Sequence, residues 1–88
     1  MSKKSLLHNM STFRVTVASV GTTLYDGEAN SVTAPGSAGE MTLLPHHEPL
    51  ISTLRKGVIT VRFNGESKMY PVERGILECS GERLLVLL

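Results

Sequence analysis

Short apolar and polar alternation, rather than a helical period, characterises this chain. Phe13–Val17 alternates apolar and polar residues, which predicts a half-buried strand. Ala29–Ala34 alternates more weakly, with Val32 and Ala34 on one side. From Gly21 onward the interval between one Gly or Pro and the next rarely exceeds about nine residues, a spacing that suits short strands joined by turns.

The clearest local signal is Asn64-Gly65, which separates Val58–Phe63 from Glu66–Val72. Asn-Gly readily adopts the positive φ angles of a two-residue type I′ turn, so a β-hairpin is predicted here. Pairing across this turn places five apolar side chains on one face: Ile59, Val61, Phe63, Tyr70 and Val72. Lys68 then falls opposite Val61, and we expect its ammonium group to reach water at the rim.

A second hairpin is predicted near the end of the chain. It consists of Ile76–Cys79, a turn around Ser80-Gly81-Glu82, and Arg83–Leu88. The unbroken apolar run Leu84–Leu88 has two interpretations: a last core strand, or an edge that further chain or a partner covers. Six or more short strands at this spacing predict an all-β fold, a flattened β-sandwich or barrel. Residues 13–88 would form this domain, and residues 1–12 a flexible N-terminal tail.

Composition narrows the class of protein. Eighty-eight residues make one domain, and 41% hydrophobic content with a net charge of +1 is typical of a folded soluble protein. A nucleic-acid partner is disfavoured because such proteins usually carry a basic patch. No apolar stretch approaches the ~20 residues of a transmembrane helix. The single cysteine, Cys79, excludes an intrachain disulfide, fits a reducing compartment, and is interpreted as a small apolar core residue.

The segment Pro45-His46-His47-Glu48-Pro49 invites interpretation as a metal site or a catalytic base. Adjacent residues on an extended backbone point to opposite faces, however, so the two imidazoles cannot chelate one ion together. The sequence has no ordered catalytic motif, and Gly36-Ser37-Ala38-Gly39 lacks the lysine and following helix of a phosphate loop. We therefore expect no enzyme activity, no metal and no cofactor. A binding function is favoured, and a free-standing adaptor or small-ligand module is one candidate.

The segment Val32–Leu50 resembles the signature of the epsilon subunit of F-type ATP synthases, which runs roughly V-x-x-P-G-x-x-G-E-L-G-I-L-P-G-H-A-P-L. Four further segments resemble elements of that family: an opening strand at Phe13–Ser19, a turn at Leu24–Glu28, the element at Leu54–Val61 and a strand at Gly75–Cys79. The resemblance covers about residues 13–88. Departures from the pattern occur at Ala38, Thr42, His46, Glu48 and Glu73-Arg74. His46 and Thr42 replace glycines, so these positions either avoid positive φ or adopt it at a cost.

The resemblance implies a ten-stranded β-sandwich at the foot of the central stalk. Its implied role is a non-catalytic rotor subunit that couples the gamma shaft to the membrane c ring during proton- or sodium-driven ATP synthesis. Ring contacts carry over to Ser37, Gly39, Glu40 and Met41, and gamma contacts to Ser19 and His47. Glu40 would pair with a cation on the polar loops of the ring.

The resemblance also bears on localisation and extent. It implies a peripheral protein on the cytoplasmic face of the bacterial plasma membrane, monomeric when isolated. The family commonly adds a C-terminal helical hairpin beyond the position of Leu88, so the chain is expected to be either a short member or an excised domain. The coupling ion and any regulation of ATP hydrolysis are left open.

Overall fold

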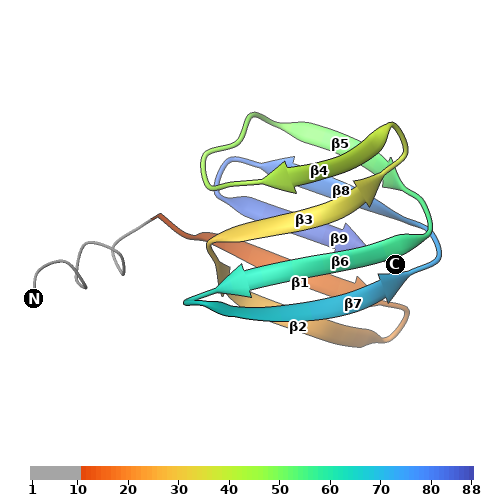
Figure 1. The fold of residues 1–88 in the computed structure, drawn as a ribbon, viewed down its shortest axis with the longest axis horizontal. Coiled ribbons are helices and arrows are strands. Elements are labelled where there is room, and N and C mark those ends of the chain that lie inside the picture. Colours follow the sequence, from red (N-terminus) through yellow and green to blue (C-terminus); the bar gives the residue numbers. More distant parts are fainter. Residues whose placement is uncertain (1–10) are drawn as a thin grey trace, which may run out of the picture.

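The computed structural model describes residues 11–88. These residues form nine β-strands, close to the ten expected (Figure 1). In chain order the strands are β1 (Phe13–Ser19), β2 (Thr22–Ala29), β3 (Ser31–Gly36), β4 (Gly39–Leu43), β5 (Leu50–Leu54), β6 (Gly57–Phe63), β7 (Glu66–Val72), β8 (Gly75–Ser80) and β9 (Arg83–Leu87). Within residues 11–88, no helix is long and apolar enough to cross a membrane.

The strands form two layers, which confirms the predicted all-β sandwich. One layer has the order β4-β3-β6-β7, and the other has the order β5-β8-β9-β1-β2 (Figure 1). A bridge between Gly36 and Leu54 joins the layers at one corner, so they make a single curled sheet. The first and last strands, β1 and β9, pair in parallel.

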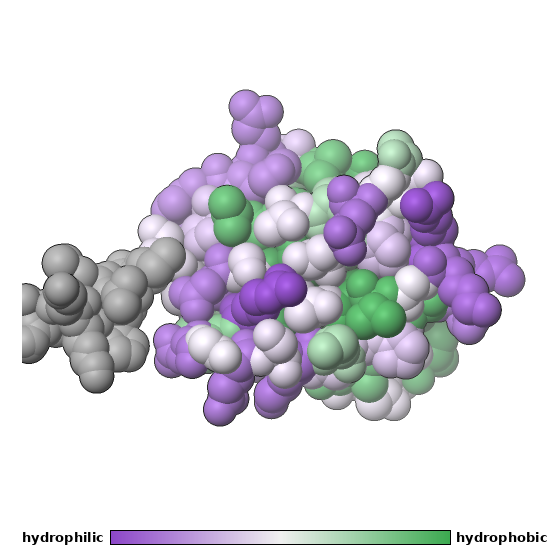
Figure 2. Space-filling model, viewed as in Figure 1, coloured by the Kyte–Doolittle hydropathy of each residue, from purple (hydrophilic) through white to green (hydrophobic). Residues whose placement is uncertain are grey.

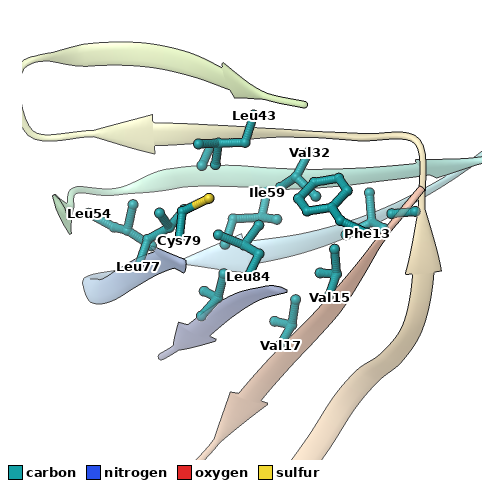
Figure 3. Close-up of a cluster of buried hydrophobic side chains, with 14 of the residues drawn as sticks. Phe13, Val15, Val17, Val32, Leu43, Leu54, Ile59, Leu77, Cys79 and Leu84 are labelled. Atoms are coloured by element: carbon teal, nitrogen blue, oxygen red, sulfur yellow. The ribbon is translucent and has the colours of Figure 1, made fainter. Parts of the chain in front are cut away.

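The core lies between the two layers, on the inward side of each strand. The alternation in β1 is confirmed, since Phe13, Val15 and Val17 are buried while Arg14 between them is exposed. These side chains meet residues of the opposite layer, including Val32 of β3 (Figure 3). Cys79 is a free, buried thiol in this cluster, as expected, and its burial raises its pKa.

The Asn64-Gly65 hairpin forms as predicted. Asn64 and Gly65 have φ angles of 52° and 82°, and β6 pairs with β7 in the expected register, with Val61 opposite Lys68. Lys68 is exposed, and its Nζ lies 5.8 Å from the centre of the Tyr25 ring on β2. Glu66, opposite Phe63, lies on the same side of the hairpin and is also exposed. The contact with the Tyr25 ring therefore accounts for Lys68, whose ammonium group lies over an aromatic face.

The apolar C-terminal run forms an interior strand of its layer. β9 pairs with β1 on one edge and with β8 on the other. Its inward residues Leu84 and Val86 are buried, but Leu87 on the outward side is 50% exposed. Ile76 of β8 lies opposite Leu87 and is 49% exposed. The last-core-strand interpretation is thus confirmed, although the outer face of this layer is not covered by residues 11–88.

The turns between strands lie at two opposite ends of the sandwich. Strands β1, β3, β5 and β7 run one way, so the turns that follow them lie together at one end of the sandwich (right in Figure 1). We call this the Ser37 end, made of residues 20–21, 37–38, 55–56 and 73–74. The connections after β2, β4, β6 and β8 form the opposite end, which we call the His47 end: residues 30, 44–49, 64–65 and 81–82.

Candidate partner-binding surfaces

The turn that carries the predicted ring contacts is a tight connection between β3 and β4. Gly36 pairs with Gly39, which leaves Ser37 and Ala38 as the two turn residues. Gly39 has a φ of 138°, a conformation that L side chains rarely adopt. A Cβ on Gly36 would lie 2.9 Å from the carbonyl oxygen of Gly39, so this turn requires glycine at both positions.

Hydrogen bonds fix the turn to the neighbouring strand β5. The amide of Ser37 donates to the carbonyl oxygen of Thr53 over 3.0 Å, and the Ser37 hydroxyl also contacts Thr53. Two residues earlier, the carbonyl oxygen of Pro35 accepts from the amide of Arg55 over 2.9 Å. The turn is therefore held in one position on the sandwich. The side chain of Ser37 serves that anchoring, while the residue itself remains exposed.

Glu40 and Met41 point to opposite sides of β4. Glu40 is exposed on the outer face, in register with Pro35. Met41 is half-buried and packs against the core, beneath Gly36. Among the four residues assigned to ring contact, Glu40 thus presents a free charged group, whereas Met41 and Gly39 shape the turn that positions it.

Ser19, assigned to gamma contact, lies at the Ser37 end of β1. It is exposed and borders a shallow groove of about 460 Å³ between the two layers. The rest of the lining combines apolar or aromatic residues of β2, β7 and the C-terminus with two charged residues of the β7–β8 turn: Leu24, Tyr70, Pro71, Leu88, Glu73 and Arg74. A partner at Ser19 would therefore also contact apolar surface.

His47, also assigned to gamma contact, lies at the His47 end in the β4–β5 connection. Its amide donates to the carbonyl oxygen of Leu44 over 3.2 Å, and its Nδ1 lies 2.9 Å from the carbonyl oxygen of Glu48. The neighbouring His46 turns away to Glu82, with 3.5 Å between Nδ1 and Oε2. His46 has a φ of 67°, so it adopts the strained conformation that the family's glycine would tolerate. The two imidazoles thus have separate partners.

The two residues assigned to gamma lie at opposite ends of the sandwich, because Ser19 ends β1 and His47 lies in the connection after β4 (Figure 1). Ser19 instead shares its end with the Ser37 turn. One partner that contacts both Ser19 and His47 must therefore run along the length of the sandwich. A family pattern along the sequence does not reveal this separation, because it depends on strand direction.

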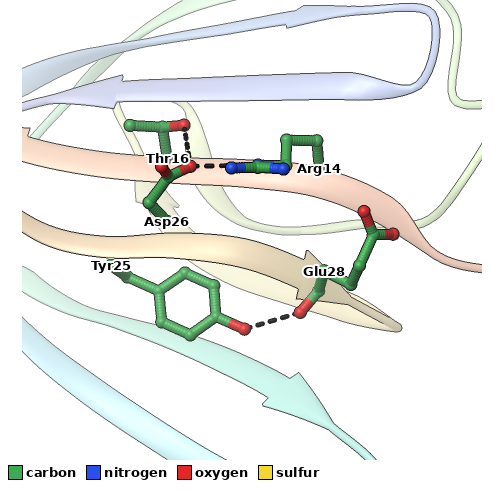
Figure 4. Close-up of polar contacts among 5 residues, drawn as sticks. All are labelled: Arg14, Thr16, Tyr25, Asp26 and Glu28. Carbon is green, nitrogen blue, oxygen red and sulfur yellow. Dashed lines mark hydrogen bonds and ion pairs between the residues drawn. The ribbon is translucent and has the colours of Figure 1, made fainter.

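A polar cluster on the outer face of β1 and β2 was not anticipated from the sequence. Arg14 Nε and Thr16 Oγ1 donate to the same oxygen of Asp26, over 3.0 and 3.1 Å (Figure 4). The hydrogen bond from Arg14 is the main reason that the pKa of the Asp26 carboxyl is lowered. β2 is mostly exposed, so it has little alternation from which its register with β1 could be predicted.

The face formed by β3, β4, β6 and β7 carries both polar and apolar side chains. Figure 2 shows a hydrophobic patch over β6 and β7 towards the Ser37 end, where Val58 is 46% exposed and Met69 67% exposed. A cavity of about 100 Å³ lies near Tyr25, Phe63 and Lys68. It is smaller than the ~300 Å³ or more that a typical small-molecule site requires. This cavity is therefore too small for a typical ligand, whereas the shallow groove beside Ser19 has sufficient volume.

Comparison with known proteins decides the family. Residues 12–88, which include the whole sandwich, match the family described as "ATP synthase, Delta/Epsilon chain, beta-sandwich domain". The chain belongs to this family. It is 43% identical over 79 residues to the ATP synthase epsilon chain of Bordetella petrii, covering 89% of this chain and 56% of the relative. It is 36% identical over 74 residues to the epsilon chain of Leptospira interrogans, covering 84% and 58%.

Solved structures share the fold of this family member. A chain of the Euglena gracilis mitochondrial ATP synthase, in a structure of OSCP, F1 and the c-ring, matches with a TM-score of 0.81 at 18% identity. The match covers 86% of this chain and 49% of that one. A chain from the central stalk and c-ring of the Tetrahymena thermophila enzyme matches with a TM-score of 0.71 at 15% identity, covering 84% and 60%. This family member spans about half the length of the curated relatives it matches.

Proposed function

We propose that this chain is a non-catalytic rotor subunit of an F-type ATP synthase. In this role it joins the gamma shaft to the membrane c ring, so that ion flux through the ring drives ATP synthesis at other subunits. The observation that carries the proposal is the family match, which includes every strand of the sandwich from Phe13 to Leu87.

The Ser37 end is proposed to face the ring. Ser37 lies in the β3–β4 turn, which is held firmly on the sandwich, and Gly39, Glu40 and Met41 begin the strand that follows it. Glu40 is the exposed carboxylate of this segment. A pair between Glu40 and a cation of the ring would be partly solvated and would contribute roughly 0.5–1 kcal/mol. Its main effect would be on the register between the two surfaces.

Ser19 and His47 are proposed to contact gamma, which would then extend along one side of the sandwich. Such a partner fits the groove beside Ser19, since Leu24, Tyr70 and Leu88 offer apolar surface there. The isolated chain is proposed to be monomeric. In the complex it would be peripheral to the cytoplasmic face of the bacterial plasma membrane, with no nucleic-acid partner and no cofactor.

The proposal can be tested by reconstitution with gamma and the c ring from the same source. The chain should co-purify with gamma, and Glu40→Lys should reduce ATP-driven ion pumping more than it reduces ATP hydrolysis. Glu66→Lys is a matched control, because Glu66 is an exposed strand carboxylate near the other end of the sandwich. A chain that fails to bind gamma from its own source would contradict the rotor role.

The gamma contacts can be mapped by cross-linking. Ser19→Cys and His47→Cys introduce exposed or half-buried thiols, and the native Cys79 interferes little because it is 1% exposed and burial raises its pKa. Both variants should cross-link to gamma in the assembled complex. Cross-linking from only one of them would show that gamma does not run along the length of the sandwich.

A further inference from the structure

The two ends of the sandwich carry opposite charge. The turns of the Ser37 end hold Arg55, Lys56, Arg74 and one acid, Glu73, all exposed. The described connections of the His47 end hold no Lys or Arg, but two exposed carboxylates, Glu48 and Glu82. Counting these turn residues at pH 7 gives +2 (three cations less one acid) at the Ser37 end and −2 at the other; with Glu40 and Arg83 of the adjoining strands the values are +1 and −1. An acidic partner surface would therefore be attracted to one end and repelled by the other.

The three cations of the Ser37 end are available to a partner. Within residues 11–88 the ion pairs are Arg14–Asp26 and His46–Glu82, and neither involves this group. The described side-chain hydrogen bonds do not engage Arg55, Lys56 or Arg74 either. A partner that binds these cations would not have to break an existing ion pair.

Strand pairing places the cations close to Glu40, the proposed ring contact. The amide of Arg55 donates to Pro35, and Pro35 pairs on its other side with Glu40. Glu40 and Arg55 are thus two strand spacings apart, about 10 Å, across a shared neighbour. Arg74 is next to Gly75, which pairs with Leu54 beside Arg55. A surface that meets Glu40 at this end therefore meets Arg55, Lys56 and Arg74 as well.

We propose that Arg55, Lys56 and Arg74 form a second, cationic half of the ring contact and bind carboxylates on the polar loops of the ring. This inference rests on the proposed function. It requires a partner surface of mixed charge, with a cation opposite Glu40 and carboxylates opposite the three basic residues. The mixed pattern fixes the register in a way that a single Glu40 pair cannot, because a shifted partner would place like charges together.

The test uses the full chain bound to gamma and the c ring of the same source. Arg74→Glu is compared with Arg83→Glu, the same charge change at an exposed arginine beside a turn of the His47 end. Arg74 also lines the groove proposed for gamma, so binding of gamma is measured separately, and the double variant Arg55→Glu/Lys56→Glu leaves that groove unchanged. Arg74→Glu and the double variant should each weaken binding of the c ring to the gamma-bound chain about tenfold and reduce the salt dependence of that binding. Arg83→Glu should change the affinity for the c ring less than about twofold, and Arg74→Lys should bind the ring as the wild-type chain does.

The outcomes separate this inference from the proposed function. If the wild-type chain binds neither gamma nor the ring, the proposed function itself fails. If the wild-type chain binds, but the basic-turn variants bind as tightly as Arg83→Glu, the cationic half of the contact is overturned while the rotor role stands. Circular dichroism and thermal unfolding of each variant verify that a loss of binding is not a loss of fold.

A lipid surface is the competing partner, because Val20, 94% exposed, also lies at the Ser37 end. Cations beside an exposed apolar residue can bind anionic membranes. Vesicles that contain phosphatidylglycerol but no ring test this alternative, with phosphatidylcholine vesicles as the control. Binding of the wild-type chain to the anionic vesicles, lost in Arg55→Glu/Lys56→Glu, would overturn the assignment to the ring. No binding to either vesicle supports it.

Discussion

At the scale of single residues, His46 combines backbone strain with an ion pair. Its φ of 67° places the backbone of this non-glycine residue in the left-handed region. Its Nδ1 lies 3.5 Å from a carboxylate oxygen of Glu82. Both side chains are well exposed, so the pair contributes little, and it is charged only when the imidazole is protonated. Backbone strain at a non-glycine residue costs of the order of 1 kcal/mol. The free energy that the backbone strain costs should therefore exceed the free energy that the His46–Glu82 pair contributes.

Substitution at His46 separates these two effects. His46→Ala removes the imidazole but keeps a Cβ at positive φ, so it should be slightly less stable than the wild-type chain. His46→Gly removes the imidazole and the strain, and should be about 0.5–1 kcal/mol more stable than His46→Ala in urea unfolding at pH 8. Equal stability of the two variants would show that the loop adjusts to relieve the strain.

The Asp26 carboxyl makes stability depend on pH. Arg14 and Thr16 donate to it and lower its folded-state pKa below the ordinary value of 3.8. Its contribution is present above that ordinary value and is lost as the pH falls through the lowered folded-state pKa. Asp26→Asn should therefore lower the melting temperature by a few degrees at most near pH 7, and the difference should shrink progressively as the pH falls below 3.8.

Glu78→Gln is the control for this pH dependence, because Glu78 is an exposed strand carboxylate with no described ion-pair partner. Differential scanning calorimetry across the acid range provides the measurement. A difference between wild type and Asp26→Asn that stays constant as the pH falls across the acid range would rule out the ionised Asp26 carboxylate as its source.

At the scale of elements, inward-facing alternation was predictable and exposed edges were not. β1 and the β6–β7 hairpin were predicted because alternate side chains are buried and Asn64-Gly65 determines the register. The turn predicted at Leu24–Glu28 is wrong, because these residues lie within the strand β2. Seven of the eight residues of β2 lie at least partly in water, so the strand leaves little pattern. The residues assigned to ring contact by family resemblance fall in one turn and the start of β4, but their division into an exposed Glu40 and an inward Met41 required the strand register.

Gly75 of β8 and Gly27 of β2 differ in the space that surrounds them, so substitution by alanine should have different effects on stability. A Cβ on Gly75 would lie 2.5 Å from the backbone oxygen of Leu87, and the backbone of β9 cannot move without disturbing its buried neighbours. A Cβ on Gly27 would meet only the Tyr25 ring at ordinary contact distances. Gly75→Ala should therefore cost about 1–3 kcal/mol, and Gly27→Ala about 0.5 kcal/mol or less, in urea unfolding. Similar losses for the two variants would contradict the close approach of β8 and β9.

At the scale of the whole molecule, β9 completes the sandwich. It lies between β8 and β1, so the β1–β2 hairpin joins the rest of its layer through β9. This parallel pairing of the first and last strands is non-local, and no local sequence pattern specifies it. Leu84 and Val86 of β9 are fully buried, so the same strand also contributes to the core between the layers.

Removal of residues 83–88 should therefore prevent cooperative folding rather than trim an edge. The deletion separates β1 and β2 from β8 and exposes the core beside Val15 and Val17, a loss that a chain of this size cannot compensate. Its amide NMR spectrum should lose dispersion and its thermal transition should disappear. Removal of residues 1–10, which are most of the tail predicted at residues 1–12 and lie outside the described residues, is the matched control and should leave both unchanged. A folded, cooperatively melting deletion of residues 83–88 would show that β1 can pair directly with β8, and that β9 is an addition to the sandwich rather than the strand that completes it.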